Sequence, residues 1–77
     1  MTIEVMFFGQ LTDITGSSKV TVEDVTDTET LTQKLFQQYP SLSGAKFRVA
    51  VDSKLVNDNT QIGQGSKIAF MPPFSGG

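Results

Sequence analysis

The 77-residue sequence contains no cysteine, no histidine and no tryptophan. Without cysteine there are no disulfides. Without cysteine and histidine together, a Cys/His zinc site and the nucleophile–base pairs that these residues form are excluded. Packing and hydrogen bonds must therefore hold the fold, in a chain near the lower size limit for one independently folding domain.

Charge of one sign and long apolar runs are also scarce. Six basic residues against eight acidic ones give a formal net charge of −2, and no basic stripe is present, which argues against a nucleic-acid partner. No apolar run approaches the length of a membrane span, and the first residues lack the features of a signal peptide. We expect a cytoplasmic protein with neither nucleic acid nor membrane as a partner.

Alternation of apolar residues predicts four strands, at residues 2–8, 18–24, 46–52 and 67–72. The stretch between the last two is rich in turn residues, with isolated apolar anchors at Leu55, Val56 and Ile62. The residues expected to face inward from the strands are Ile3, Val5, Phe7, Val20, Val22, Phe47, Val49, Val51, Ile68 and Phe70.

One amphipathic helix is predicted between the second and third strands. Thr28 is the expected N-cap, with Asp27 as the competitor, and Leu31 and Leu35 begin the apolar stripe. Pro40 ends the helix, because the residue before a proline is biased away from helical angles. A shorter helical turn is expected over Leu11 and Ile14, with Gly16 as its stop, and Leu42 is expected beneath the turn after Pro40.

One helix packed on one face of a mixed sheet of four to five strands buries every inward residue. This α+β arrangement is a β-grasp, the ubiquitin-like architecture, and it places the first and last strands near the centre of the sheet. We expect a β-grasp domain over residues 1–71 and an extended tail over residues 72–77.

The opposite face of the sheet carries apolar residues where water would favour polar ones. They are Met6, Phe8, Ala50, Ala69 and Met71, with Leu55 able to join them. Scattered surface apolar residues need no function. If the first and last strands are neighbours, however, Phe8 and Met71 lie close together beside the tail, and the cluster is a predicted partner-docking surface.

The sequence ends on PPFSGG, which continues neither a strand nor a helix. If extended, Pro72 to Gly77 reach roughly 20 Å at about 3.3 Å per residue, and the prolines stiffen the base. Gly76 and Gly77 have no side chains and fit a channel too narrow for other residues. The reactive group at the tip is the carboxylate of Gly77, a poor electrophile until it is converted to an acyl-adenylate or a thioester. A frayed terminus is the plain alternative.

Three stretches, VMFFGQLTDITG, VAVDSKLV and GSKIAFMPPFSGG, resemble the small subunit of molybdopterin synthase, a sulfur carrier of the MoaD/ThiS-type ubiquitin-like family. The resemblance implies that an adenylating, E1-like enzyme uses ATP to activate Gly77, which then becomes a thiocarboxylate. It implies that Pro72, Pro73, Phe74, Ser75 and Gly76 insert into the large synthase subunit, and that the sulfur passes to a pterin precursor. Phe8, Leu55 and Met71 match positions that dock partners. The chain itself is expected to bind no cofactor and no metal.

Other functions remain open at this point. Carriers of the thiamine pathway also end in Gly-Gly, although they are usually shorter and lack the Pro-Pro spacer, and carriers for tungsten cofactors would look the same as this chain. A ubiquitin-like protein modifier would use the same tail to form an isopeptide bond. An independent enzyme would need paired carboxylates, but no spacing brings together two of the five candidates, Glu4, Asp13, Glu23, Asp24 and Asp58. A calcium site at Asp52, Asn57 and Asp58 lacks the spacing of a known loop, and turn formation explains these residues.

Overall fold

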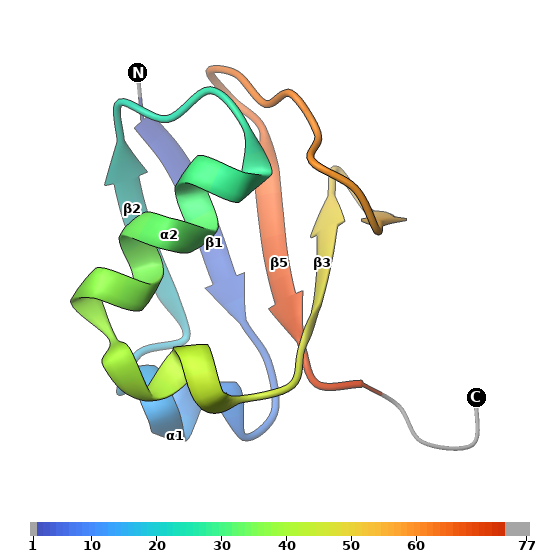
Figure 1. The fold of residues 1–77 in the computed structure, drawn as a ribbon. Coiled ribbons are helices and arrows are strands. Elements are labelled where there is room, and N and C mark those ends of the chain that lie inside the picture. Colours follow the sequence, from blue (N-terminus) through green and yellow to red (C-terminus); the bar gives the residue numbers. More distant parts are fainter. Residues whose placement is uncertain (1, 74–77) are drawn as a thin grey trace.

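A computed structural model describes residues 2–73 of the chain. Within them, a five-stranded mixed sheet is covered on one face by one main helix (Figure 1). The elements, in chain order, are β1 (Thr2–Phe7), α1 (Leu11–Thr15), β2 (Lys19–Glu23), α2 (Thr28–Gln38), the 3-10 helix η1 (Pro40–Gly44), β3 (Arg48–Val51), β4 (Lys54–Val56) and β5 (Lys67–Met71). This is the predicted β-grasp.

The strand order is β2-β1-β5-β3-β4, so the first and last strands lie inside the sheet, as the sequence predicts. Strands β1 and β5 are parallel, and the other neighbours are antiparallel. A parallel pair cannot be closed by a tight hairpin and needs a long crossover, which the helical part of the chain supplies. Strands β1 and β5 therefore end at the same end of the sheet (Figure 1).

Strand β4 corrects the sequence interpretation of residues 53–66. Lys54–Val56 pair with β3 as a short edge strand, whereas the turn residues around them predict only isolated anchors. Asp52 and Ser53 adopt positive φ angles of 48° and 73°, and this tight turn reverses the chain directly into β4. Ile62 is buried as expected.

Helix α2 begins one residue earlier than expected. Asp27 is the N-cap, with extended backbone angles, and its side chain accepts a hydrogen bond from the Thr30 N–H. Thr28 is instead the first helical residue and is buried: its hydroxyl accepts a hydrogen bond from the Thr60 N–H at 3.0 Å. The helix ends at Gln38, shortly before Pro40, as predicted.

The smaller helical elements also follow the sequence. Helix α1 ends at Gly16, whose φ of +74° and N–H bond to the Thr12 carbonyl (2.8 Å) form a left-handed C-cap. Leu42, within η1, is completely buried. Helices α1 and η1 lie together below the lower end of the sheet in Figure 1.

The core lies between α2 and the sheet. Its buried members include most of the inward residues predicted from alternation, and Phe70 stacks on Phe47 with a centroid distance of 4.8 Å. The buried apolar cluster is Ile3, Val5, Phe7, Leu11, Val22, Val25, Leu31, Leu35, Leu42, Ile62, Ile68 and Phe70; Val20, Phe47, Val49 and Val51 are partly buried against it.

Candidate functional site

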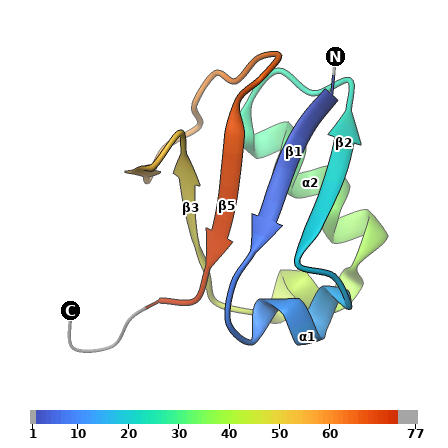
Figure 2. The same cartoon turned by 180° about the vertical axis from the view of Figure 1, so that it is seen from behind.

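The candidate site is the face of the sheet that no helix covers (Figure 2). Strand register aligns Met6 with Ala69, Ala69 with Ala50, and Ala50 with Leu55, so that one apolar row crosses four strands. These side chains share a face, because residues directly opposite one another in neighbouring strands point to the same side of the sheet. The outward apolar residues predicted from alternation therefore do form a continuous surface.

Phe8 and Met71 lie next to this row, at the end of the sheet where β1 and β5 finish. The N–H of Phe8 donates a 3.0 Å hydrogen bond to the Phe70 carbonyl, so Phe8 extends the pairing of β1 with β5 by one residue. Phe8, Leu55 and Met71 all line one shallow hollow of 310 Å³, together with Met6, Ala50 and Ala69. We call this hollow and its lining the apolar face.

Phe8 and Leu55 are exposed by 42% and 54% of their surface, and Met6 by 38%. Large apolar side chains that remain this exposed and lie side by side are typical of a surface that another protein covers. The structure thus brings together the three residues predicted to dock partners, although their role as docking residues stays a prediction.

Polar residues border the apolar row on this face. Lys19, which the register places opposite Met6, pairs with Glu4 at 3.4 Å, and both side chains are about half exposed. The backbone N–H of Lys67 donates to the Asp52 carboxylate at 2.9 Å. An exposed ion pair of this kind contributes little to stability. Charged residues therefore bound the apolar residues on the β2 side of the sheet.

The first two tail residues follow β5 directly. Pro72 packs against Gly9, and Pro73 lines a hollow with Gln10, Leu11 and Ile14 of the α1 region. A proline cannot donate to a strand ladder, which explains why the sheet ends at Met71. The other predicted tail residues, Phe74, Ser75, Gly76 and Gly77, lie outside the described residues.

Gly9 is a site residue that the sequence interpretation missed. It follows Phe8 directly, has a φ of +58° and leaves the space that the Pro72 ring occupies. The available signal was a glycine at the end of a strand, where left-handed angles are common. Nothing in the local sequence pairs that glycine with a proline at the other end of the chain.

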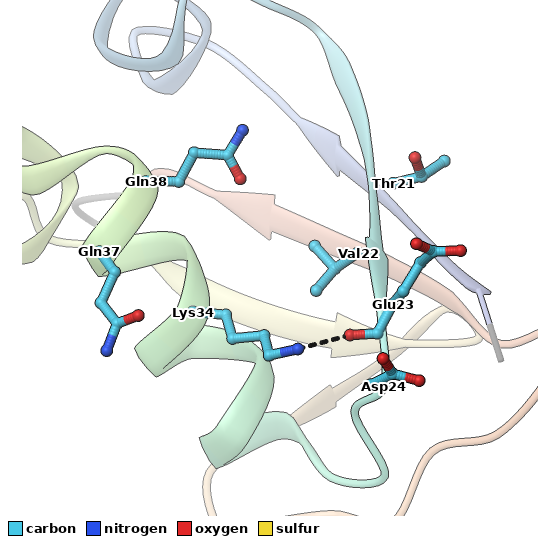
Figure 3. A pocket seen from close by; sticks show the side chains of 7 residues that line it. All are labelled: Thr21, Val22, Glu23, Asp24, Lys34, Gln37 and Gln38. Atoms are coloured by element: carbon cyan, nitrogen blue, oxygen red, sulfur yellow. Dashed lines mark hydrogen bonds between the residues drawn. The ribbon is translucent and has the colours of Figure 1, made fainter.

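A second hollow, of 440 Å³, lies between the edge strand β2 and helix α2 (Figure 3). It is polar: Lys34, Gln37 and Gln38 approach from the helix. Val22 points toward the helix, while the Thr21 and Glu23 side chains point away from it. The Lys34 ammonium donates a 2.7 Å hydrogen bond to the Glu23 carbonyl oxygen. This contact covers part of the strand edge.

The structure provides no support for an acid–base site among the five carboxylates. Glu4 is paired with Lys19, and Glu23 turns its carboxylate away from the hollow that its strand lines. Hydrogen bonds from Thr30 and Asn59 lower the pKa of the Asp27 carboxyl. This residue caps α2, away from the apolar face.

The calcium interpretation is likewise not supported. The side-chain oxygen of Asn57 accepts a 2.9 Å bond from Arg48, and that of Asp52 accepts from a backbone N–H. Among residues 2–73 there is no group of three or more acidic, histidine or cysteine side chains placed to hold a metal ion. In the same part of the chain, no helix is long and apolar enough to cross a membrane.

The sequence and the fold of this chain resemble those of known proteins. The sequence model of the ThiS family matches residues 5–77. A molybdopterin synthase sulfur carrier subunit from Caenorhabditis briggsae is 34% identical over 83 residues, which cover 100% of this chain and 99% of the relative. A protein of the same name from Mycobacterium tuberculosis is 31% identical over 80 residues, or 97% of this chain and 96% of the relative.

Two solved structures have the same fold. Small archaeal modifier protein 1 from Haloferax volcanii superimposes with a TM-score of 0.83 at 20% identity, over 95% of this chain and 98% of that one. A chain from the complex of subunits 1 and 2 of the Helicobacter pylori molybdopterin-converting factor superimposes with a TM-score of 0.74 at 25% identity, over 100% of both chains. The first likeness, at this identity, concerns the fold alone.

Proposed function

Because the chain belongs to the ThiS family, we propose that it is a sulfur carrier that acts as the small subunit of a molybdopterin synthase. The observation that carries the proposal is the 34% identity to a sulfur carrier subunit over essentially the full length of both chains. The Gly-Gly ending and the apolar face beside the tail agree with it.

In this proposal the working group is the carboxylate of Gly77. One of its oxygens attacks the α-phosphorus of ATP on an adenylating enzyme, and pyrophosphate leaves. A sulfur nucleophile at the oxidation level of hydrosulfide then attacks the acyl carbon of the adenylate, and AMP leaves. The product is a thiocarboxylate at Gly77. Its sulfur bonds to a carbon of the pterin precursor in place of an oxygen leaving group, and water then hydrolyses the resulting thioester, which leaves the sulfur on the precursor and restores the carboxylate.

The chain contributes no catalytic side chain to these steps. It supplies a docking surface and a tail. A partner binds the apolar face, and Pro72 to Gly76 guide the terminal carboxylate into the partner's active site. The proposed partners are the adenylating enzyme and the large synthase subunit. The complex of subunits 1 and 2 formed by the Helicobacter pylori relative supports the second partner.

Intact-mass measurement tests this function. The chain is incubated with the adenylating enzyme, ATP and a sulfur donor, and we expect a gain of one sulfur-for-oxygen exchange that requires Gly77. The charged chain, mixed with a large synthase subunit and the pterin precursor, should lose that mass again. A chain that is never adenylated, or that keeps its sulfur, would contradict the proposal.

A protein modifier is the second candidate, and the Gly-Gly ending, which can serve either chemistry, is the observation that favours it. It starts from the same adenylate but ends in an isopeptide bond to a lysine. Cell extract separates the two: a modifier gives conjugates of higher mass, and a carrier gives the thiocarboxylate. A carrier for another sulfur-containing cofactor would be charged in the same way but would fail to act on the pterin precursor.

A further inference from the structure

Gly9 and Pro72 make the tightest approach described for any glycine of this chain. A Cβ atom built on Gly9 would lie 2.7 Å from Cγ and 3.4 Å from Cδ of Pro72, whereas Gly16, Gly44, Gly63 and Gly65 have nothing within 4 Å of such an atom. Carbon atoms attract best at about 3.5–4.0 Å. The proline ring therefore occupies space that any side chain at position 9 would need.

The turn that contains Gly9 is held from both sides. Phe8 is bonded to the Phe70 carbonyl, and the Gly9 carbonyl accepts bonds from the Thr12 hydroxyl at 2.7 Å and the Thr12 N–H at 3.2 Å. Gly9 thus sits between a sheet hydrogen bond and the first turn of α1. A shift of Gly9 away from Pro72 would therefore lengthen or bend these hydrogen bonds.

Pro72 is equally restricted. Met71, immediately before it, is paired with Arg48 in β5 and β3. The proline ring is closed on its own backbone nitrogen, so Cγ cannot rotate away from Gly9 and moves only by a change of ring pucker. Relief beyond that small shift requires a change of backbone direction at Pro72, where the tail begins.

A small change of direction at the base becomes large at the tip. Five residues beyond Pro72 give Gly77 a reach of up to about 17 Å, so a rotation of ~10° at the base displaces it by ~3 Å. Misplacement of a reacting group by ~1 Å is enough to cost about a hundredfold in rate. Tail direction is therefore a property that the chain must control.

We propose that Gly9 is a positioning residue for the C-terminal tail: its missing side chain lets the Pro72 ring lie across the β1–α1 turn and so sets the direction in which the tail leaves the domain. The inference rests on the proposed function for its consequence in the reaction. The contact itself does not depend on that function.

The test uses the full chain and four variants, compared with the wild type. Gly9→Ala places a Cβ against Pro72, and Gly16→Ala is the matched control: both glycines have left-handed φ angles, of 58° and 74°, but a Cβ on Gly16 meets nothing. Both alanines carry the same backbone strain, and only the first reaches the tail. The double variant Gly9→Ala/Pro72→Ala removes the ring atoms that clash, and Pro72→Ala alone is its reference.

Two readouts are recorded well below the melting temperature of every variant. N–H residual dipolar couplings of Met71, Phe74 and Ser75, with Cα–Hα couplings of Pro72 and Pro73, report tail direction without any partner; we expect them to change in Gly9→Ala and to match the wild type in Gly16→Ala. The rate of pyrophosphate release with the adenylating enzyme should fall about tenfold or more in Gly9→Ala. It should stay within about twofold in Gly16→Ala, and the double variant should equal Pro72→Ala.

Unchanged couplings in Gly9→Ala, or equal rates for the two glycine variants, would overturn the inference. The same holds if the double variant stays slower than Pro72→Ala, since the effect would then not pass through the ring. If the wild type itself releases no pyrophosphate, the proposed function fails, and the couplings still decide the role of Gly9.

Discussion

The N–H of Phe8 donates a hydrogen bond of 3.0 Å to the carbonyl oxygen of Phe70. This bond joins the ends of the first and last strands. It places the exposed Phe8 beside Met71. The next residue, Gly9, contacts Pro72, where the tail begins. Phe8 of the apolar face and the start of the tail are therefore neighbours in space, although they come from opposite ends of the chain.

Deletion of Gly77 tests the chemistry of the tail directly. We expect adenylation to be lost, because Gly76 would then carry the terminal carboxylate one residue short of the partner's nucleotide. The buried apolar cluster runs from Ile3 to Phe70, so the melting temperature should stay the same. Pyrophosphate release checks the loss of adenylation, and thermal unfolding of the same preparation checks the melting temperature. Normal activation of the shortened chain would contradict the prediction.

Phe8→Asp tests the apolar face. A carboxylate in the centre of a buried interface has no partner, and loss of an aromatic anchor commonly costs about 2 kcal/mol or more, or ~30-fold in Kd. Because Phe8 is substantially exposed in the free chain, the free energy of unfolding should change by about 1 kcal/mol or less. Titration calorimetry with the large subunit and thermal unfolding provide both values.

Gln37→Asp is the control for that experiment, since Gln37 lies on α2 at the polar hollow of Figure 3 and adds the same charge away from the apolar face. Its Kd should equal that of the wild type. If Phe8→Asp instead unfolds the chain, Phe8 belongs to the core. If it binds as well as Gln37→Asp, Phe8 does not belong to the docking surface.

Lys34→Met tests whether the lysine protects the open edge of β2. Register and the Phe7–Ser18 hydrogen bond mean that Lys19, Thr21 and Glu23 turn their backbone groups away from β1, and the Lys34 ammonium occupies the Glu23 carbonyl. Edge lysines discourage pairing with a further strand. We expect Lys34→Met to increase self-association in sedimentation-velocity experiments.

The matched control is Lys46→Met, which makes the same change of charge in the segment before β3. It should sediment as the wild type does. Equal behaviour of the two variants would mean that charge alone, and not coverage of the edge, governs association.

Asp27→Asn tests the pH dependence of the cap of α2. Hydrogen bonds from Thr30 and from Asn59 lower the pKa of Asp27 in the folded chain. A group with a depressed folded pKa stabilises the fold above its unfolded pKa, and this contribution disappears as the pH falls through the folded value. The wild type should therefore lose stability relative to Asp27→Asn as the pH falls below about 4.

Urea unfolding near pH 7 and near pH 2.5 would measure that difference. Asp27→Ala, which removes the cap at any pH, should be the least stable of the three proteins near pH 7. A difference between wild type and Asp27→Asn that does not vary with pH would show that the carboxylate is not what the cap requires.

Local patterns predicted the elements because the information they need is local. Alternation with period two assigns the faces of Ile3, Val5 and Phe7, and the spacing of Leu31 and Leu35 defines the buried side of α2; the structure confirms both. The error at the N-cap has a tertiary cause. Asn59 accepts a 2.9 Å bond from the Glu29 N–H, and Thr60 binds the Thr28 hydroxyl, so a distant loop helps to decide where the helix starts.

The short strand β4 was missed for a similar reason. Lys54–Val56 is too short and too exposed for alternation to identify, and it becomes a strand because β3 offers an unpaired edge. The sequence interpretation placed Leu55 near the apolar face correctly. Its place on a strand opposite Ala50 follows from pairing alone.

By itself, the sequence determined which residues face the helix, which face outward and where the sheet must stop, and it predicted a tail whose reactive group is the carboxylate of Gly77. These follow from backbone periodicity, from proline's missing N–H and from the functional groups present. Only the tertiary structure decided that Phe8, Leu55 and Met71 line one hollow and that Pro72 rests on Gly9. Strand register and close packing between distant segments depend on the whole sheet and core, and no local pattern contains them.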